Sequence, residues 1–219
     1  EIKECHGKKW VDNYSWIHQK NILDVLKDSS KLDKKVRNYL EAENKYTDYH
    51  LKKTRKLQKD LFNEIKGRIK LDNTSLPFKD KKYEYWSKTT KSGNYSIKLR
   101  KKINTNKIEI YWDGNKEYKL SNSNYFGIGD INVSHNDKLL AYSLDLKGSE
   151  YYTIYIRRIS DKKKISSQIK DTSGSITFSL DDKYIFYSKL DNNHRPKKIF
   201  RHEIGTPIKN DKLIYEEKN

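Results

Sequence analysis

Several residue types that would narrow the interpretation are rare or missing in this chain. Among its 219 residues there is no methionine, and there are one cysteine, three prolines and nine glycines. Because Cys5 has no second cysteine to pair with, an internal disulfide is excluded and a reducing compartment is favoured. Apolar runs stay far below the roughly 18 residues of a transmembrane helix, and the N-terminus is too polar for a secretory signal. We expect a cytoplasmic protein with no membrane partner, cut or excerpted from a longer polypeptide because it begins with glutamate.

The sequence patterns of common catalytic and cofactor sites are missing as well. No two glycines flank a serine as Gly-x-Ser-x-Gly, there is no glycine-rich phosphate loop, and no Cys/His pair has metal-ligand spacing. The two adjacent carboxylate pairs, at residues 181–182 and 216–217, are poor acid–base pairs because neighbours in a strand point to opposite faces. No histidine follows a serine and an aspartate in a plausible hydrolase order; the six are His6, His18, His50, His135, His194 and His202. We predict no catalytic residue, no cofactor site and no metal site here.

The net charge is +17, from 47 basic and 30 acidic residues. Such an excess can indicate a nucleic acid or an anionic surface as the partner. Lysine is nevertheless spread from Lys3 to Lys218, and no RNP1-like motif or basic helix gathers it into one patch. We therefore interpret lysine as the general surface residue of this chain and predict no nucleic-acid partner.

Two segments of the chain repeat one another at a constant distance. Residues 134–143 are echoed by residues 179–188, with five identities 45 positions apart (179 − 134, 182 − 137, 183 − 138, 187 − 142 and 188 − 143). A sequence repeat of this length that consists of short β segments is typical of one four-stranded propeller blade. Because propellers close with several blades, the repeat predicts part of a larger protein.

Each copy predicts the same succession of strands. A strand ends at Val133 or Phe178, and an Asp-containing turn follows, since Asp and Asn bond their own backbone and tolerate left-handed geometry. The later strands of the copies are predicted at residues 139–143, 151–156 and 164–169, and at 184–188, 198–204 and 212–216. An earlier blade that lacks the Asp-Lys turn is predicted from strands at residues 82–87, 95–100 and 107–112. A β-sandwich with two similar hairpins is the alternative.

The first part of the chain has helical periodicity instead. Apolar residues three and four apart predict one amphipathic helix over residues 32–69, with Asp33 as its N-cap, and a shorter helix over residues 19–27. Asp, Asn, Ser and Pro cluster at residues 71–78, and everything after them is predicted to be β. The predicted domains are residues 1–75, a helical arm, and residues 76–219, about three blades of an incomplete propeller. The apolar face of this helix must be buried against another surface, and the predicted blades offer no obvious surface for it.

Several short motifs, taken in order, resemble the N-terminal region of prolyl oligopeptidase-type serine peptidases, with the oligopeptidase B branch as the most similar. In the arm they are His6-Gly7, Asp12, Tyr14, Trp16, Tyr39-Leu40, Glu43-Asn44, Leu61-Phe62 and Glu64-Ile65. In the blades they are Tyr95, Asp113, Asn115-Lys116, Ala141 to Asp145, Gly148 to Tyr151, Arg201-His202, Gly205 to Pro207, Asp211 and Tyr215 to Glu217.

The resemblance implies a seven-bladed propeller that restricts entry to an α/β-hydrolase domain, to which the helical arm belongs. It implies a serine endopeptidase that cleaves short peptides after Arg or Lys, with its Ser-His-Asp triad in a part that this chain does not contain. Short basic peptides and the hydrolase domain are then the expected partners, and residues 12–16 are expected to anchor the arm. The alternative is a stand-alone or degenerate propeller-like module that binds without catalysis.

Overall fold

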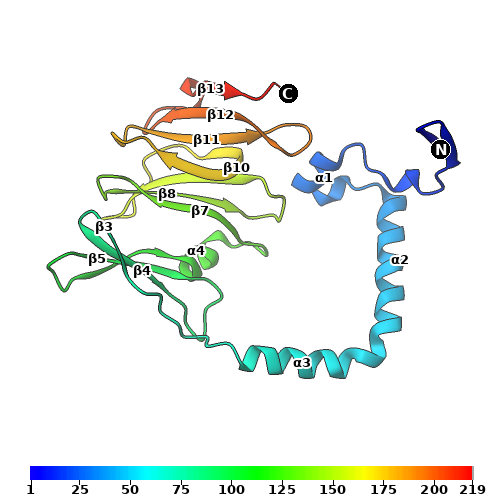
Figure 1. Ribbon diagram of the computed structural model, residues 1–219, viewed down its shortest axis with the longest axis horizontal. Helices are drawn as coiled ribbons and strands as arrows, with labels where there is room; N and C mark the ends of the chain where they lie inside the picture. The colour runs from blue at the N-terminus through cyan, green and yellow to red at the C-terminus, as the bar shows by residue number, and fades with distance from the viewer. Residues whose placement is uncertain (219) are drawn as a thin grey trace. The chain divides into compact units, whose positions relative to one another are not determined.

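The computed structural model describes residues 1–218, and contacts divide the chain into two compact units, Glu1–Ile69 and Lys70–Asn219 (Figure 1). The first unit begins with a hairpin of β1 (Ile2–Cys5) and β2 (Lys8–Val11). His6 and Gly7 form its two-residue turn with φ of 50° and 74°, the left-handed pair that a tight hairpin requires. Three helices follow, α1 (Ile22–Lys27), α2 (Lys34–Leu51) and α3 (Arg55–Gly67), and no helix of residues 1–218 is long and apolar enough to cross a membrane.

The prediction of one helix over residues 32–69 is wrong in one respect, because the helix breaks between α2 and α3. A 3₁₀ turn occupies Lys52–Thr54, where the Thr54 hydroxyl donates to the Leu51 carbonyl at 2.8 Å. This side-chain bond to the preceding turn competes with the helical ladder and bends the chain, so that α2 and α3 run in different directions (Figure 1). The predicted start at Asp33 is confirmed, since its carboxylate accepts from the backbone N–H groups of Lys35 and Val36.

The second unit opens with a four-stranded antiparallel sheet, the first blade. Its strands are β3 (Phe78–Asp80), β4 (Tyr83–Lys88), β5 (Ile97–Lys102) and β6 (Ile108–Asp113), in that spatial order. A helix then follows, α4 (Gly114–Ser121), which corrects the expectation that everything after the arm is β. The Asp113 carboxylate caps α4 by accepting from the N–H groups of Asn115 and Lys116, and the helix ends at Asn122 with φ of 48°.

The remaining strands form two further blades joined by one long strand. They are β7 (Gly127–Val133), β8 (Leu139–Asp145), β9 (Tyr152–Arg158), β10 (Ile169–Phe178), β11 (Tyr184–Leu190), β12 (Pro196–Glu203) and β13 (Lys212–Glu216). The first half of β10 pairs with β9 and its second half with β11. The pairing shifts around Gly174, whose φ of 95° suits glycine, so β10 ends the second blade and begins the third.

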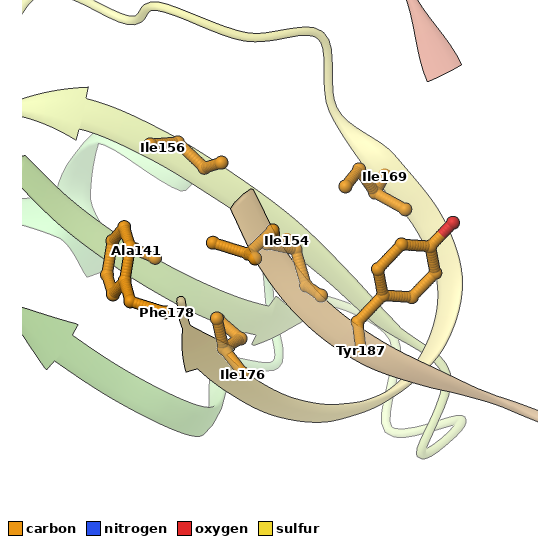
Figure 2. Packing of buried hydrophobic residues seen from close by; sticks show 8 residues of the cluster. Ala141, Ile154, Ile156, Ile169, Ile176, Phe178 and Tyr187 are labelled. Carbon is orange, nitrogen blue, oxygen red and sulfur yellow. The ribbon is translucent and has the colours of Figure 1, made fainter. Parts of the chain in front are cut away.

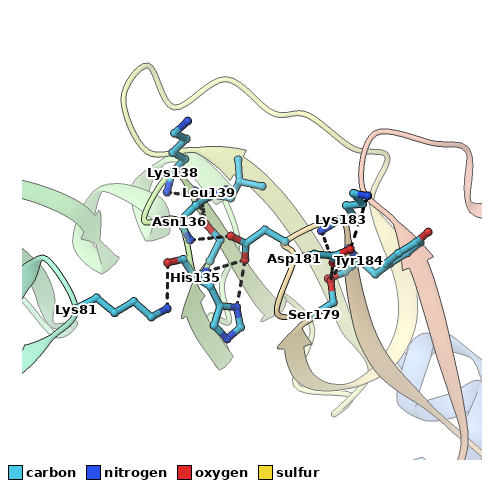
Figure 3. Close-up of polar contacts among 11 residues, drawn as sticks. Lys81, His135, Asn136, Lys138, Leu139, Ser179, Asp181, Lys183 and Tyr184 are labelled. Atoms are coloured by element: carbon cyan, nitrogen blue, oxygen red, sulfur yellow. Dashed lines mark hydrogen bonds and ion pairs between the residues drawn. The ribbon is translucent and has the colours of Figure 1, made fainter.

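The predicted repeat is confirmed by bonds that recur 45 residues apart (Figure 3). The Ser134 hydroxyl accepts from the Leu139 N–H at 2.9 Å, and the Ser179 hydroxyl accepts from the Tyr184 N–H at 3.0 Å. Asp137 and Asp182 occupy the left-handed region of their turns, with φ of 64° and 57°. In the first blade Lys81 takes this position with φ of 50°, so the turn persists there without aspartate.

Two apolar clusters hold the blades together. One joins the second and third blades through the buried side chains of Ala141, Ile154, Ile156, Ile169, Ile176, Phe178, Ile185 and Tyr187. All of these except Ile185 are labelled in Figure 2. The other joins the first and second blades through Trp112, Phe126, Leu140, Tyr142, Leu144 and Ile159. Each fully buried side chain of this kind contributes about 1.5–3 kcal/mol. The blades therefore pack face to face as layers, and the sandwich alternative is excluded.

Candidate functional site

The polar residues of the resemblance motifs mostly organise loops. The buried carboxylate of Asp145 accepts from the N–H groups of Lys147, Gly148 and Glu150 at 2.9, 3.1 and 2.8 Å. These bonds close the loop between β8 and β9. In the first blade, the Asn115 side chain bonds both the N–H and the carbonyl of Tyr95, at 3.0 and 2.8 Å. Both motifs thus determine how strands are connected, and neither presents a reactive group.

The carboxylates predicted to be poor catalytic partners do bond in different directions. Asp181 accepts from the Ser179 hydroxyl at 2.6 Å, within its own turn. Asp182 instead accepts from the backbone N–H groups of His135 and Asn136 in the preceding blade, at 2.7 Å each. Asp181 therefore stabilises its own turn, and Asp182 joins that turn to the corresponding turn of the preceding blade.

A serine of the loop before β10 meets a histidine and an aspartate of the third blade. His202 on β12 is fully buried, and its Nδ1 lies 2.6 Å from a carboxylate oxygen of Asp211. Its Nε2 lies 3.4 Å from the hydroxyl oxygen of Ser166. The Tyr187 hydroxyl donates to the other Asp211 oxygen at 2.7 Å, and burial together with this bond raises the pKa of Tyr187. The order of atoms is that of a Ser-His-Asp relay.

The surroundings of this cluster differ from those of a hydrolytic triad. The His202 ring has no exposed surface, so it cannot reach a leaving group on a bound peptide. The Ser166 hydroxyl oxygen already accepts from the Gly205 N–H at 2.8 Å. The cluster ties the loop before β10 to the turn after β12 and to the segment before β13. Sequence reasoning missed Ser166, because it lies 36 residues from His202 and carries no motif of its own.

Polar side chains also form hydrogen bonds between strands of neighbouring blades. The Asn132 side-chain amide donates to the Ile176 carbonyl at 2.7 Å, and the Ile176 N–H donates to the Asp130 carboxylate at 3.1 Å. The Ser143 hydroxyl donates to the Gly174 carbonyl at 2.6 Å. These bonds run between β7 or β8 and the second half of β10. They stabilise the angle between blades, on which any opening along a propeller axis depends.

The helical arm presents an apolar surface of its own. On α3 the exposed fractions of Leu57, Leu61, Phe62 and Ile65 are 58%, 47%, 61% and 61%. The spacing of three and four places them along one stripe of the helix, as predicted. Trp16, one of the expected anchor residues, packs edge-on against Tyr39 of α2 at 5.3 Å between ring centroids, within the arm itself.

The order of elements, a helical arm and then four-stranded blades, agrees with a family model. The model described as the prolyl oligopeptidase N-terminal β-propeller domain matches residues 1–219. The chain belongs to this family. The predicted resemblance is thereby confirmed, as is the mainly β fold with part of a propeller after the arm.

Relatives with known names are similar over nearly the whole chain. Dipeptidyl aminopeptidase BI from Pseudoxanthomonas mexicana is 27% identical, and the match covers 100% of this chain and 31% of the relative. Protease 2 from Moraxella lacunata is 24% identical, over 99% of this chain and 31% of the relative. The solved structure of oligopeptidase B from Leishmania major has a TM-score of 0.84 at 26% identity, over 97% of this chain and 29% of that one. The chain thus spans about three tenths of these prolyl oligopeptidase-family peptidases.

Proposed function

We propose that this chain is the N-terminal part of a serine endopeptidase similar to oligopeptidase B, which cleaves short peptides after Arg or Lys. The observation that carries the proposal is the fold likeness to oligopeptidase B, with a TM-score of 0.84 over 97% of the chain. In this reading the blades are part of a filter that admits short peptides, and catalysis resides in an α/β-hydrolase domain outside the chain. The free, exposed thiol of Cys5 is compatible with work in a reducing compartment such as the cytoplasm.

The arm has the surface that such a partner requires. The stripe of Leu57, Leu61, Phe62 and Ile65 on α3 is exposed, and an exposed apolar stripe of this kind is typical of a docking surface. We assign the hydrolase domain as its partner. The basic side chain of the substrate must be read by acidic groups of that domain, because this chain carries a net charge of +17 and repels cations.

No residue of this chain is assigned a catalytic role. The one Ser-His-Asp arrangement described above, Ser166, His202 and Asp211, is assigned to stabilising the third blade because its histidine is fully buried. No cofactor or metal is assigned either, since serine peptidase chemistry needs neither.

The test is substrate profiling of the longest native polypeptide that contains this chain. We expect hydrolysis of short fluorogenic peptides with Arg or Lys before the cleaved bond to exceed that with Pro or Ala by about a hundredfold. Preference for Pro, or release of dipeptides from the N-terminus, would move the assignment toward the prolyl endopeptidases or the dipeptidyl aminopeptidase among the relatives. Residues 1–219 alone should be inactive, and activity of a purified preparation would contradict the absence of a catalytic site.

The size of the native polypeptide tests the alternative. An antibody against this segment should detect a species far heavier than 26.2 kDa in the source cell. A species near that mass would favour a binding module without catalysis.

A further inference from the structure

The turn before β11 repeats the hydrogen bonds of the turn before β8. The Asp137 N–H donates to the Ser134 carbonyl at 3.0 Å, and the Asp182 N–H donates to the Ser179 carbonyl at 2.9 Å. In both turns the serine hydroxyl also donates to the side chain two residues further on, at 2.9 and 2.6 Å. Because the two turns are built alike, the backbone N–H groups of their two central residues are presented in the same way.

The central N–H groups of these two turns differ in their partners. In the second blade the N–H groups of His135 and Asn136 donate to the Asp182 carboxylate of the third blade, at 2.7 Å each. The residue equivalent to His135 in the third blade is Leu180, 45 positions later. Its N–H forms no hydrogen bond with any of residues 1–218, and its side chain is 87% exposed. The third blade therefore offers the donor to which a following blade would bond.

The sheet beside this turn has an apolar face whose equivalent is covered in the second blade. Ile154 and Ile169 pair across β9 and β10 and are 0% and 1% exposed, because the third blade covers them. Ile199 and Tyr215 pair in the same way across β12 and β13 and are 39% and 52% exposed. Each first isoleucine lies opposite the last serine of its repeat copy, so the two pairs are equivalent. The exposed pair marks a contact surface of the kind that a further sheet covers.

One substitution between the two turns bears on the partner of Leu180. Asp181 stands where the second blade has Asn136, and its charge would repel an approaching carboxylate. Two neighbours offset this charge: the Ser179 hydroxyl donates to the carboxylate at 2.6 Å, and Lys183 Nζ lies 3.9 Å away (Figure 3). An asparagine oxygen would avoid the repulsion altogether. The expected acceptor is therefore the side-chain oxygen of an Asp or an Asn.

We propose that a further four-stranded sheet of the same polypeptide covers the face of Ile199 and Tyr215, and that a turn Asp or Asn of that sheet accepts from the Leu180 N–H. The inference rests on the proposed function in one respect, that the chain is part of a longer polypeptide. A second copy of this chain is a poorer partner, because the turn carboxylates that it carries, Asp137 and Asp182, already bond the preceding blade.

The test removes the donor and keeps the turn. Leu180→Pro has no N–H, and proline suits the first central position of a turn whose two central residues lack positive φ. Leu180→Ala is its control, because it also removes the leucine side chain and keeps the N–H. His135→Pro and His135→Ala form the matched pair at the turn where the bond is present. All four are made in the longest native polypeptide that contains this chain and are unfolded with urea.

We expect the folding equilibrium constant of Leu180→Pro to be about tenfold below that of Leu180→Ala, as for the pair at His135. Without an acceptor the proline variant would be as stable as the alanine variant or more stable, because proline restricts the unfolded chain. That result would overturn the proposal.

Amide hydrogen exchange of the unmodified polypeptide decides the question even if Leu180→Pro does not fold. The Leu180 amide should be protected to within about tenfold of the His135 amide, since both donate to a neighbouring blade. Exchange of Leu180 at the rate of an unstructured chain would overturn the proposal. Protection that disappears on dilution would do so as well, because it would identify a second copy as the partner. Peptide hydrolysis by the unmodified polypeptide is measured separately, so failure of the proposed peptidase function is distinguished from failure of this contact.

Discussion

The carboxylate of Asp182 accepts a hydrogen bond from the backbone N–H of His135 at 2.7 Å, although 47 residues separate them. Its second oxygen accepts from the N–H of Asn136, also at 2.7 Å, so one buried side chain satisfies two backbone N–H groups of another blade. The equivalent Asp137 carboxylate accepts from the Tyr85 hydroxyl of the first blade at 2.9 Å. The turn aspartate that marks the repeat in the sequence is therefore also a contact between successive blades.

Asp182→Asn tests this contact. Asparagine tolerates the left-handed backbone at this position, but one of its side-chain atoms becomes a donor that faces an N–H group. We expect the free energy of unfolding to fall by roughly 2–3 kcal/mol, measured by urea denaturation. Asp137→Asn is the matched control, because its remaining oxygen still accepts from Tyr85, and a loss of about 1 kcal/mol is expected there. Equal losses in both variants would contradict the assignment.

Ser166→Ala tests whether the buried cluster of the third blade takes part in catalysis. Peptide hydrolysis by the full-length protein should stay unchanged, because the fully buried His202 cannot serve a substrate. The lost hydroxyl leaves the Gly205 N–H without its acceptor, so a loss of roughly 1–2 kcal/mol in stability is expected. Mass spectrometry after a fluorophosphonate probe should find no label on Ser166. Labelling there, or loss of hydrolysis without a change in stability, would assign it a catalytic role.

Phe62→Asp tests the apolar stripe of α3 as a docking surface. On the docking proposed above, the charge is buried at the contact with the hydrolase domain of the longer polypeptide, and we expect a loss of roughly 3 kcal/mol in stability together with reduced hydrolysis. Residues 1–219 alone should melt as before, since 61% of the Phe62 side chain is exposed there. Asn63→Asp adds the same charge at the next position of α3 and should change neither quantity. Full activity and stability of Phe62→Asp would show that the stripe has no partner.

Tyr142 gives the protein a dependence on alkaline pH. Burial raises the pKa of its hydroxyl from the ordinary value of 10.0 to about 12, although the nearby Arg157 guanidinium lowers it. The folded state therefore retains a proton that the unfolded state loses above pH 10.0. This contribution to stability is complete below that pH and is lost as pH rises through about 12.

Comparison with Tyr142→Phe isolates this contribution. Between pH 10 and pH 12 the stability of the unmodified protein should fall relative to the variant, by up to about 1.4 kcal/mol per pH unit. Below pH 10 the difference between the two should be constant. Denaturant titrations at several pH values measure both slopes, and parallel curves over the whole range would contradict the raised pKa of Tyr142.

Local features of the fold could be predicted from the sequence. The turns at Asp137 and Asp182 follow from residues that bond their own backbone, and the cap at Asp33 follows from a carboxylate just before a helical pattern. The strand β13 lies at the predicted residues. The strands predicted in the blades lie within a few residues of their predicted limits, except that the strand predicted over residues 164–169 is replaced by β10, which begins at Ile169. The strands β1, β2 and β3 were not predicted. Such signals act over a few residues, so a single sequence contains them.

The tertiary structure alone decided the rest, because the partners lie far apart in the chain. The break between α2 and α3 depends on the hydrogen bond of the Thr54 hydroxyl. The strand β10 belongs to two blades because its first half pairs with β9 and its second half with β11. Ser166 meets His202 across 36 residues, and Arg157 meets Glu117 across 40. The sequence by itself determined the period, the turns, the helical arm and the family resemblance. Only packing of blade on blade decided which polar groups are buried together, since burial depends on neighbours that no local pattern specifies.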